Sequence, residues 1–481
     1  MMVRSFASSA GTVPMSLFLL AVALPPATAQ VYKISDRNAI VTSAQTLAFD
    51  LMTYYDGNET GEIPGMLPGP PFDGLGDYYW YQAAGFWATF IDYWRVTGDD
   101  MYNDVVAQGL LHQVGENNDF APANQTATLS NDDQCNWGVA SMLAAESRFP
   151  SPAGAPEWLA VAQNVFERLA WRLDQEDGGE CGGGLRWSIP PENAGYNYKP
   201  TTATGCFFNL AARLARHTGN EMYAKYADKS WDWMYNIGYI DNTTWSVYEG
   251  SHAELNCSDI NRTTFSVDIS SLTQGAAFMY NHTQSDAWRN RTSNLVDRFL
   301  ADFVVEDNGA FFEVPCEGVV GRCTVEMLGF KGLAHRYLAS SIQVAPFLRQ
   351  EVLPALRASA QKAIDQCTGG VSERQCGFYW SRGRFISPDL DQTTGLSEQM
   401  NVLSAVSSLL IPAADAPAFQ TSIDSTEGSG NGEEIGDDSN SDGNGEADNR
   451  TPGSGSGASF HGVNLFVVAG VLVVWGVMAW Y

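Results

Sequence analysis

A repeated helical hairpin is the sequence feature that most constrains the fold. Residues 95–102 recur as residues 216–223, and a less exact copy occupies residues 283–288. In each copy an apolar helical pattern ends at Thr or Thr-Gly, and a second helix begins just beyond, at an acidic residue or Asn. A further unit is expected midway between the first two copies, and residues 156–158 occupy that place, which gives a spacing of about 60 residues. Such a fixed period indicates a repeat architecture.

The apolar periodicity predicts twelve helices, which pair into hairpins. We expect them at residues 35–54, 80–96, 99–113, 132–147, 156–171, 205–217, 220–236, 270–281, 285–302, 326–341, 345–364 and 395–411. The pattern has no strand series and no polar end repeats of the kind that an open solenoid needs. The predicted fold is therefore all-α, a closed (α/α)6 toroid of six inner and six outer helices formed by one domain over residues 30–420.

The connections between these helices alternate in length. Turns within a hairpin are short, whereas long segments lead into the inner helices, at 56–79, 114–131, 172–204, 237–269, 303–325 and 365–394. In a toroid the long segments emerge on one face, and long loops on a rigid scaffold are where binding and catalytic residues gather. The functional site is expected on that face.

One inner helix begins with a pair of acids, Asp132 and Asp133, directly after Ser130 and Asn131. One interpretation is structural, because Ser or Asn caps a helix and acids in its first turn complement the helix dipole. The other is chemical, because retaining cleavage of a glycosidic bond needs one ionised and one protonated carboxyl group roughly 5 Å apart. Two close carboxylates resist ionising together, which raises one pKa, while the helix N-terminus favours the charge of the other.

Aromatic and amide side chains of the kind that bind sugars accompany this pair. The glycines at 182–184 would let the backbone approach a ligand, and aromatic faces stack on pyranose rings. The alternative is that these side chains anchor loops by packing on the rim. The predicted substrate-binding residues are Trp80, Tyr81, Gln134, Arg186, Trp187, Tyr196, Asn197, Tyr198 and Lys199.

The N-terminal segment predicts a secretory signal. Arg4 precedes an apolar stretch over residues 15–24, and residues 27–29 (Ala-Thr-Ala) supply a small-residue cleavage pattern. Residues 1–29 are therefore expected to be removed, so that Gln30 is the mature start.

The C-terminal segments predict a stalk and a lipid anchor. Residues 421–460 are Gly, Ser, Asn and acids with almost nothing apolar, which is typical of an extended, self-repelling stalk. Residues 461–481 are mostly apolar, follow a run of Gly and Ser, and have no cationic flank. This pattern predicts a GPI-attachment signal that is removed from the mature protein. A retained C-terminal membrane anchor is the alternative.

Cysteines, histidines, charge and sequons fit an extracellular protein that does not bind nucleic acid. Eight cysteines in an oxidising compartment predict disulfides, and Cys316–Cys323 and Cys367–Cys376 are the local pairs. Cys181–Cys206 is the next expected pair, which leaves Cys135–Cys257.

Six scattered His predict no zinc site, and a formal charge of −28 argues against nucleic acid. The sequons, expected to include glycosylated surface sites, are Asn58, Asn124, Asn242, Asn256, Asn261, Asn281, Asn290 and Asn449.

Several motifs in the same order together resemble glycoside hydrolase family 76, and within it the fungal GPI-anchored mannan endo-1,6-α-mannosidases of the cell wall. The resemblance covers residues 32–410. It is carried by residues 131–134 (Asn-Asp-Asp-Gln) with Trp137-Gly138, and by residues 181–187 (Cys-Gly-Gly-Gly-Leu-Arg-Trp), 205–215, 57–61, 112–115 and 330–332. Cys135-Asn136 departs from the family pattern.

The resemblance implies a monomeric six-hairpin toroid that cleaves α-1,6-mannosidic bonds with retention of configuration, without metal or cofactor. Asp132 would be the nucleophile and Asp133 the general acid/base. The donor would be α-1,6-mannan or the mannose core of a GPI glycan, and a transglycosidase would use β-glucan as acceptor, at the plasma membrane and in the cell wall. The hypothesis from another class is a non-catalytic carbohydrate-binding wall protein, which would have no need of two carboxylates at one point.

Overall fold

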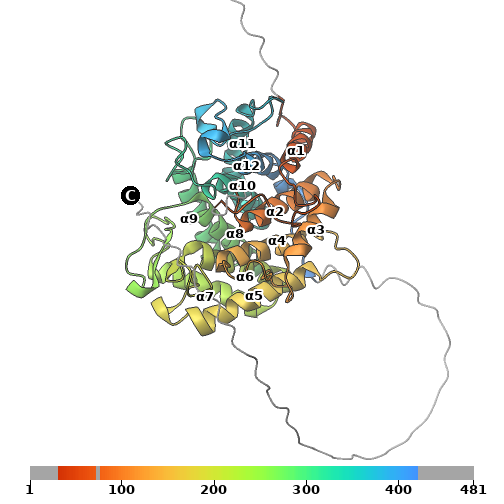
Figure 1. Ribbon diagram of the computed structural model, residues 1–481. Helices are drawn as coiled ribbons and strands as arrows, with labels where there is room; N and C mark the ends of the chain where they lie inside the picture. The colour runs from red at the N-terminus through yellow and green to blue at the C-terminus, as the bar shows by residue number, and fades with distance from the viewer. Residues whose placement is uncertain (1–30, 72–75, 421–481) are drawn as a thin grey trace, which may run out of the picture. The chain divides into compact units, whose positions relative to one another are not determined.

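The computed structural model describes residues 31–71 and 76–420 (Figure 1). The predicted signal peptide, stalk and GPI-attachment tail lie outside these residues. Within them, no helix has both the length and the apolar character needed to cross a membrane.

All twelve predicted helices are present, and they form the expected all-α toroid (Figure 1). The inner helices are α2 (Trp80–Thr97), α4 (Asn131–Ser147), α6 (Thr201–Thr218), α8 (Ser266–Thr283), α10 (Phe330–Val344) and α12 (Leu396–Ser408). The outer helices are α1 (Arg37–Met52), α3 (Asn103–Gln113), α5 (Trp158–Arg172), α7 (Glu221–Ile237), α9 (Asp286–Phe303) and α11 (Arg349–Asp365). Each inner helix contacts the next, and α12 contacts α2, which closes the ring.

The sequence repeat corresponds to one recurring turn between an inner and an outer helix. Gly98, Gly219 and Gln284 follow the last residues of α2, α6 and α8, and all three adopt the left-handed conformation, with φ of 77°, 70° and 54°. In two copies the residue that opens the outer helix, Asn220 or Ser285, accepts a hydrogen bond from a backbone N–H of that helix. Glycine is favoured at such a position because it has no Cβ to strain.

The long segments that precede the inner helices meet one another at one end of the toroid, as the loop lengths predicted. Their hydrogen bonds and bridges form a chain around this end, which we call the mouth. One link is the short antiparallel pair of β1 (Tyr198–Pro200) and β2 (Gly250–His252). The contacts join Ser130 to Ser188, Tyr198 to His252, Ser266 to Glu313, Gly321 to Asp391, and Asp77 to Thr394.

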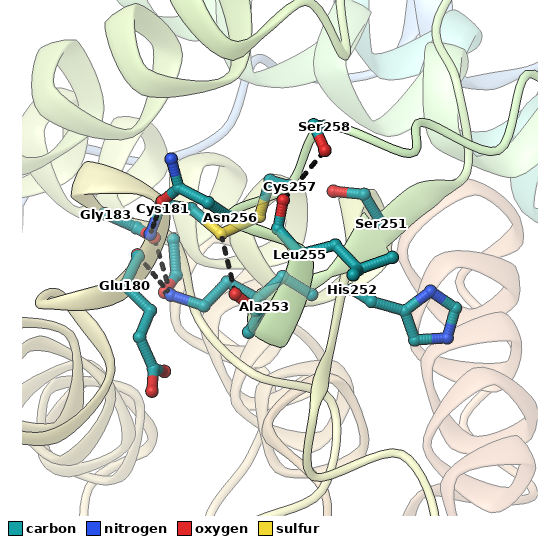
Figure 2. Close-up of a disulfide and its surroundings, with 12 residues drawn as sticks. Glu180, Cys181, Gly183, Ser251, His252, Ala253, Leu255, Asn256, Cys257 and Ser258 are labelled. Atoms are coloured by element: carbon teal, nitrogen blue, oxygen red, sulfur yellow. Dashed lines mark hydrogen bonds between the residues drawn. A yellow bond between two sulfur atoms is a disulfide. The ribbon is translucent and has the colours of Figure 1, made fainter.

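Two of the four disulfides differ from the prediction. The local pairs Cys316–Cys323 and Cys367–Cys376 are confirmed. The other two pairs were wrong, because Cys135 is bonded to Cys206 across α4 and α6, and Cys181 is bonded to Cys257 across two mouth segments (Figure 2). Neighbouring inner helices bring Cys135 and Cys206 to a Cα–Cα distance of 6.1 Å although they lie 71 residues apart. Spacing along the chain carries no information about such a contact.

Candidate active site

The acid pair lies in the first turn of α4, at the mouth. Ser130 caps the helix by accepting a hydrogen bond from the Asp133 N–H at 3.2 Å, and its hydroxyl donates to Asp132 Oδ1 at 2.5 Å. Both aspartates are half-buried. The capping interpretation is therefore correct for Ser130, yet the cap leaves both carboxylates in place for chemistry.

The carboxylate of Asp132 is held by three donors. Besides Ser130, the Asp133 N–H donates to Oδ1 at 3.1 Å, and Thr202 Oγ1 of α6 donates to Oδ2 at 3.0 Å. Burial raises the pKa of Asp132, whereas the hydrogen bonds from Ser130, Thr202 and the backbone lower it. Donors of this kind stabilise the ionised form.

Burial raises the pKa of both carboxyl groups, but the second one has fewer hydrogen bonds to oppose it. Burial raises the pKa of Asp133 well above its usual range, the negative charge of Asp132 raises it further, and so does that of Glu326, while the Ser130 hydroxyl opposes these effects. When two neighbouring acids have such different surroundings, one proton is shared unequally between them. We assign the charge to Asp132 and the proton to Asp133.

An axial cavity adjoins the pair. Its volume is about 850 Å³, including space open to solvent, and side chains from all six inner helices line it. At the mouth its walls include Tyr81, Asn136 and Glu326, and its far end is lined by charged side chains such as Arg213 and Arg336. Burial raises the pKa of Tyr81 well above its usual range, and the negative charges of Glu326, Asp133 and Asp132 raise it further, in that order of size, which links the cavity wall to the acid pair.

Three of the predicted substrate-binding residues lie close to the mouth surface. Trp187 is 46 % exposed, and its backbone carbonyl accepts a hydrogen bond from the Asn131 N–H at 2.9 Å, so its backbone adjoins the start of α4. Tyr196 is half-buried, with the Arg186 guanidinium 4.3 Å from its ring centroid. Asn197 is exposed. Together with Tyr81 in the cavity wall, these side chains are open to a ligand.

Other predicted substrate-binding residues are engaged by the protein itself. Trp80 donates from its indole to Gln113 Oε1 at 2.9 Å, and Gln134 is fully buried between the Asp119 carbonyl and Arg172. Successive residues on a helix point about 100° apart, so the neighbours of Tyr81 and Asp133 turn away from the cavity. For Trp80 and Gln134, the structure supports the alternative of anchoring side chains.

Arg186, Tyr198 and Lys199 also hold the loop before α6 rather than face a ligand. The Lys199 ammonium has no exposed surface and donates to four backbone carbonyls, those of residues 177, 180, 183 and 184, at 2.6–3.1 Å. Arg186 is 5 % exposed and pairs with Asp177, and Tyr198 donates to Glu249. These three correct the prediction of substrate contacts, because the loop folds back over its own polar side chains.

The sequence analysis did not single out three residues that adjoin the acid pair. Thr202 contacts Asp132 directly, and Glu326 lines the cavity. Asp268, in the first turn of α8, is 3 % exposed, and its Oδ2 has no hydrogen-bond partner. Burial and the charges of Glu249, Glu313 and Asp132 raise its pKa well above the usual range. A search for acids at the start of every inner helix would have found Asp268.

The predicted glycosylation sites divide by exposure. Asn281 is half-buried, and its side-chain amide donates to the Val344 carbonyl at 2.9 Å and accepts from Arg216 at 2.8 Å. Because this amide is part of the packing between helices, Asn281 is no longer proposed as a glycosylation site. Asn449 lies outside the described residues. The exposed sequons are Asn58, Asn124, Asn242, Asn256, Asn261 and Asn290.

The described part of the chain contains no group of three or more His, Cys, Asp or Glu side chains arranged to hold a metal ion. The two acids in the first turn of α4 are the kind of carboxyl pair that glycoside hydrolysis uses. A closed helical toroid with such a pair at its mouth has the features of a glycoside hydrolase.

Comparison with known proteins specifies the family. The sequence matches glycosyl hydrolase family 76 over residues 39–421. It is 38 % identical over 375 residues to the mannan endo-1,6-α-mannosidase DCW1 of Candida glabrata, covering 78 % of this chain and 80 % of that protein. The DCW1 protein of Saccharomyces cerevisiae is 36 % identical over 390 residues, covering 81 % and 82 %. The chain belongs to glycosyl hydrolase family 76, together with these fungal mannan endo-1,6-α-mannosidases.

Solved structures agree in fold. The crystal structure of Dfg5 from Chaetomium thermophilum in complex with glucosamine is similar, with a TM-score of 0.79 and 51 % identity, and the match covers 82 % of this chain and 95 % of that one. An inactive variant of the α-1,6-mannanase GH76A of Salegentibacter sp. in complex with α-1,6-mannotriose has a TM-score of 0.60 at 16 % identity, covering 78 % and 100 %. At that identity the second likeness shows the fold alone.

Proposed function

We propose that this protein is a mannan endo-1,6-α-mannosidase that retains anomeric configuration, with Asp132 as nucleophile and Asp133 as general acid/base. The observation that carries the proposal is the unequal acid pair at the start of α4. Asp132 accepts hydrogen bonds from three donors, and burial together with neighbouring charge keeps the proton on Asp133. The α-1,6-mannosidic substrate is taken from the names of the fungal relatives.

The reaction takes two steps. In the first, an Asp132 oxygen attacks the anomeric carbon while Asp133 gives its proton to the glycosidic oxygen, so the C–O bond to the leaving sugar breaks and a glycosyl ester forms. In the second, the Asp133 carboxylate removes a proton from an incoming hydroxyl, which attacks the same carbon and releases Asp132. Two inversions leave the configuration unchanged.

The second step also decides between hydrolysis and transfer. Water as the incoming hydroxyl gives mannan hydrolysis, and a sugar hydroxyl gives a new glycosidic bond. We propose α-1,6-mannan or the mannose core of a GPI glycan as donor and β-glucan as the acceptor in the transfer reaction. The exposed ring of Trp187, whose backbone adjoins α4, offers a stacking surface for either sugar.

The proposed place of action follows from the segments outside the described residues. The signal pattern at 1–29 and the GPI-attachment pattern at 461–481 would export the protein and tether it at the outer face of the plasma membrane or in the cell wall. Residues 421–460 would then separate the toroid from its anchor. The body is proposed to act as a monomer.

Product analysis tests the proposal. Secreted protein without its apolar tail is incubated with α-1,6-mannotetraose, with and without a β-glucan oligosaccharide, and the products are identified by mass spectrometry and NMR. Shorter mannans that first appear as the α-anomer support retaining hydrolysis, and mannosyl-glucan supports transfer. First-formed β-anomer contradicts the glycosyl-Asp132 intermediate. Binding without any product favours the non-catalytic carbohydrate-binding hypothesis.

A further inference from the structure

A third carboxylate, that of Glu326, lines the axial cavity together with Asn136, whose amide donates to the Asp132 carbonyl. We propose that Glu326 is a positioning residue of the reaction, whose negative charge keeps the proton on Asp133 until the leaving group takes it. This inference rests on the proposed function, because it gives Glu326 a role through the general acid of that mechanism.

The cavity wall brings Glu326 and the pair together from different elements. Glu326 precedes the 3-10 turn at residues 327–329 that runs into α10, whereas Tyr81 belongs to α2 and Asn136 to α4, one turn below Asp132. All three line the axial cavity. Burial raises the pKa of Tyr81 most, and the charges of Glu326 and of the two aspartates both raise it further, so both sides act on the same side chain.

Buried amides hold the backbone of this segment on both sides of Glu326. Gln82 of α2 donates to the Val325 carbonyl at 3.2 Å. Asn401 of α12 donates to the Leu328 carbonyl at 2.5 Å and accepts from the Gly332 N–H at 2.8 Å. The backbone on both sides of Glu326 is therefore held in place by side chains of α2 and α12.

In the described part of the chain, no hydrogen bond or ion pair compensates the charge of the Glu326 carboxylate. Within residues 31–71 and 76–420 it forms no hydrogen bond and no ion pair, whereas Glu317, nine residues earlier, is fully buried and pairs with Lys331 at 3.0 Å. The charges that act on Asp133 are those of Asp132 and Glu326, and no Lys or Arg of the described residues is among them. A half-buried carboxylate left unpaired at a reaction site is more easily explained by function than by stability.

The same charge would serve both steps. A neighbouring anion disfavours ionisation of Asp133, so the acid stays protonated at the pH where the first step needs it. Once the leaving group has taken the proton, the same repulsion makes the Asp133 carboxylate a stronger base toward the incoming hydroxyl. Removal of the charge should lower the pH at which Asp133 ionises.

The test is the pH profile of kcat/KM on α-1,6-mannotetraose for the wild-type chain and the Glu326→Gln variant. In Glu326→Gln, the fall of kcat/KM at high pH, which we call the basic limb, should move down by about 0.5–1 pH unit. This is the size expected for one charge acting across several ångströms of partly solvated protein. Activity below the limb stays near the wild-type value. Glu326→Asp, which retains the charge, keeps the limb within about 0.3 unit of the wild type.

The matched control is Glu306→Gln, which removes an exposed charge from the same loop and should leave the profile unchanged. A uniform loss of activity for Glu326→Gln at every pH, with no movement of the limb, would overturn the proposal and assign Glu326 a purely steric role. Direct NMR titration of the Asp133 carboxyl in both chains separates this inference from the proposed function, because it needs no turnover. An identical titration of Asp133 in the two chains also overturns it.

Discussion

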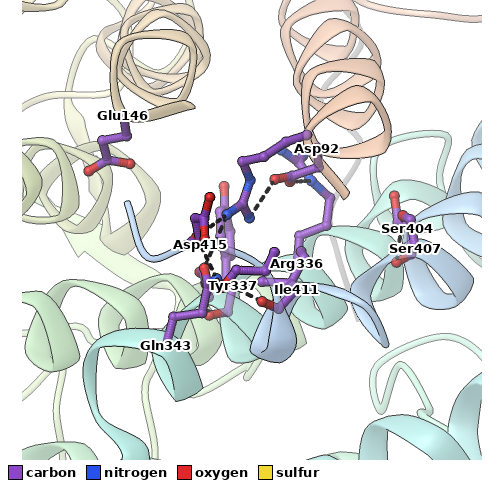
Figure 3. A network of polar contacts seen from close by, with 12 residues as sticks. Asp92, Glu146, Arg336, Tyr337, Gln343, Ser404, Ser407, Ile411 and Asp415 are labelled. Atoms are coloured by element: carbon purple, nitrogen blue, oxygen red, sulfur yellow. Dashed lines mark hydrogen bonds and ion pairs between the residues drawn. The ribbon is translucent and has the colours of Figure 1, made fainter. Parts of the chain in front are cut away.

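The two ends of the axial cavity both hold buried charges, but they arrange them in opposite ways. At the far end, Arg213 pairs with Glu146 at 2.6 Å. Arg336 pairs with Asp92 at 2.7 Å (Figure 3), and all four side chains are less than 8 % exposed. At the mouth, the acids Asp132, Asp133 and Glu326 have no cationic partner in the described residues.

The far end is closed as well as paired. The stretch 411–418 crosses it and is held by side chains of the inner helices. Gln343 donates to the carbonyls of Ile411 and Asp415 (Figure 3). Arg216 donates to that of Pro417. Pairing and closure together make this end structural, whereas the unpaired acids at the mouth make that end reactive.

The helices themselves favour this division. The N-terminal ends of the inner helices, which carry partial positive charge, lie at the mouth and stabilise acids in their first turns. Their C-terminal ends lie at the other side and favour arginine, as at Arg95 and Arg216. The helix dipoles thus favour the acids at the mouth as well as the arginines at the far end. The two ends differ in whether each charged side chain has an oppositely charged partner.

The largest expected effect is at the mouth. Asp132→Asn and Asp133→Asn should each lower kcat on α-1,6-mannotetraose by about 10²–10⁴-fold, because each removes a group that acts on the bond being broken. Thermal unfolding should show both variants folded, with a loss of about 1 kcal/mol or less, since Ser130 still caps α4. Near-normal turnover in either variant would remove that residue from the mechanism.

The next effect is at the far end. Arg213→Met should lower the free energy of unfolding by about 3–5 kcal/mol, because it leaves the buried Glu146 carboxylate without a partner. Urea denaturation measures the change. The control is Arg298→Met, which breaks a pair of about 30 % and 19 % exposed side chains on α9 and should change stability by about 1 kcal/mol or less. Equal losses for the two variants would mean that burial does not distinguish the pairs.

Buried acids also predict how stability depends on pH. Burial raises the pKa of Glu313 to about 8 and that of Glu398 to about 7, and burial raises those of Asp133 and Asp268 as well. Between about pH 4.5 and 8 the folded chain then binds more protons than the unfolded chain, so stability falls as pH rises. We expect the Tm to be highest near about pH 5 and to decrease toward pH 8.

Calorimetric measurement of Tm between pH 5 and 8, for the wild type and for Glu398→Gln, tests whether the buried acids cause this pH dependence. Glu398 opens α12 at the mouth, and its Oε2 has no partner, so the neutral amide should fit and reduce the slope of Tm against pH. A Tm that rises from pH 5 to 8 would contradict the assignment of protonated acids to the mouth.

The smallest expected effect tests the surface of the mouth. Trp187→Ala should raise KM for α-1,6-mannotetraose about fivefold with little change in Tm, because a stacking contact contributes about 1 kcal/mol. Trp171 on α5 is the matched control, since it is 51 % exposed but belongs to an outer helix. Trp171→Ala should leave KM unchanged, and equal KM values for the two variants would place sugar binding away from Trp187.

Local sequence patterns predicted the elements well and the site in part. The repeated Thr-Gly turn and the apolar periodicity identified twelve helices, because helix formation and capping depend on residues within a few positions of each other. The same reasoning placed Asp132 and Asp133 at a helix start. It could not separate Tyr81, which lines the cavity, from Trp80, which is buried against Gln113.

The sequence by itself determined the hairpins, their number and the position of the acid pair in the first turn of an inner helix. Only the tertiary structure decided which cysteines meet, that Lys199 is enclosed by carbonyls, and that Glu326 and Asp268 adjoin an acid pair more than 130 residues away. The physical reason is the distance along the chain over which each kind of interaction acts. Caps and periodicity act over one or two turns, whereas the rotation of each helix about its axis is set by packing against neighbours from distant parts of the chain.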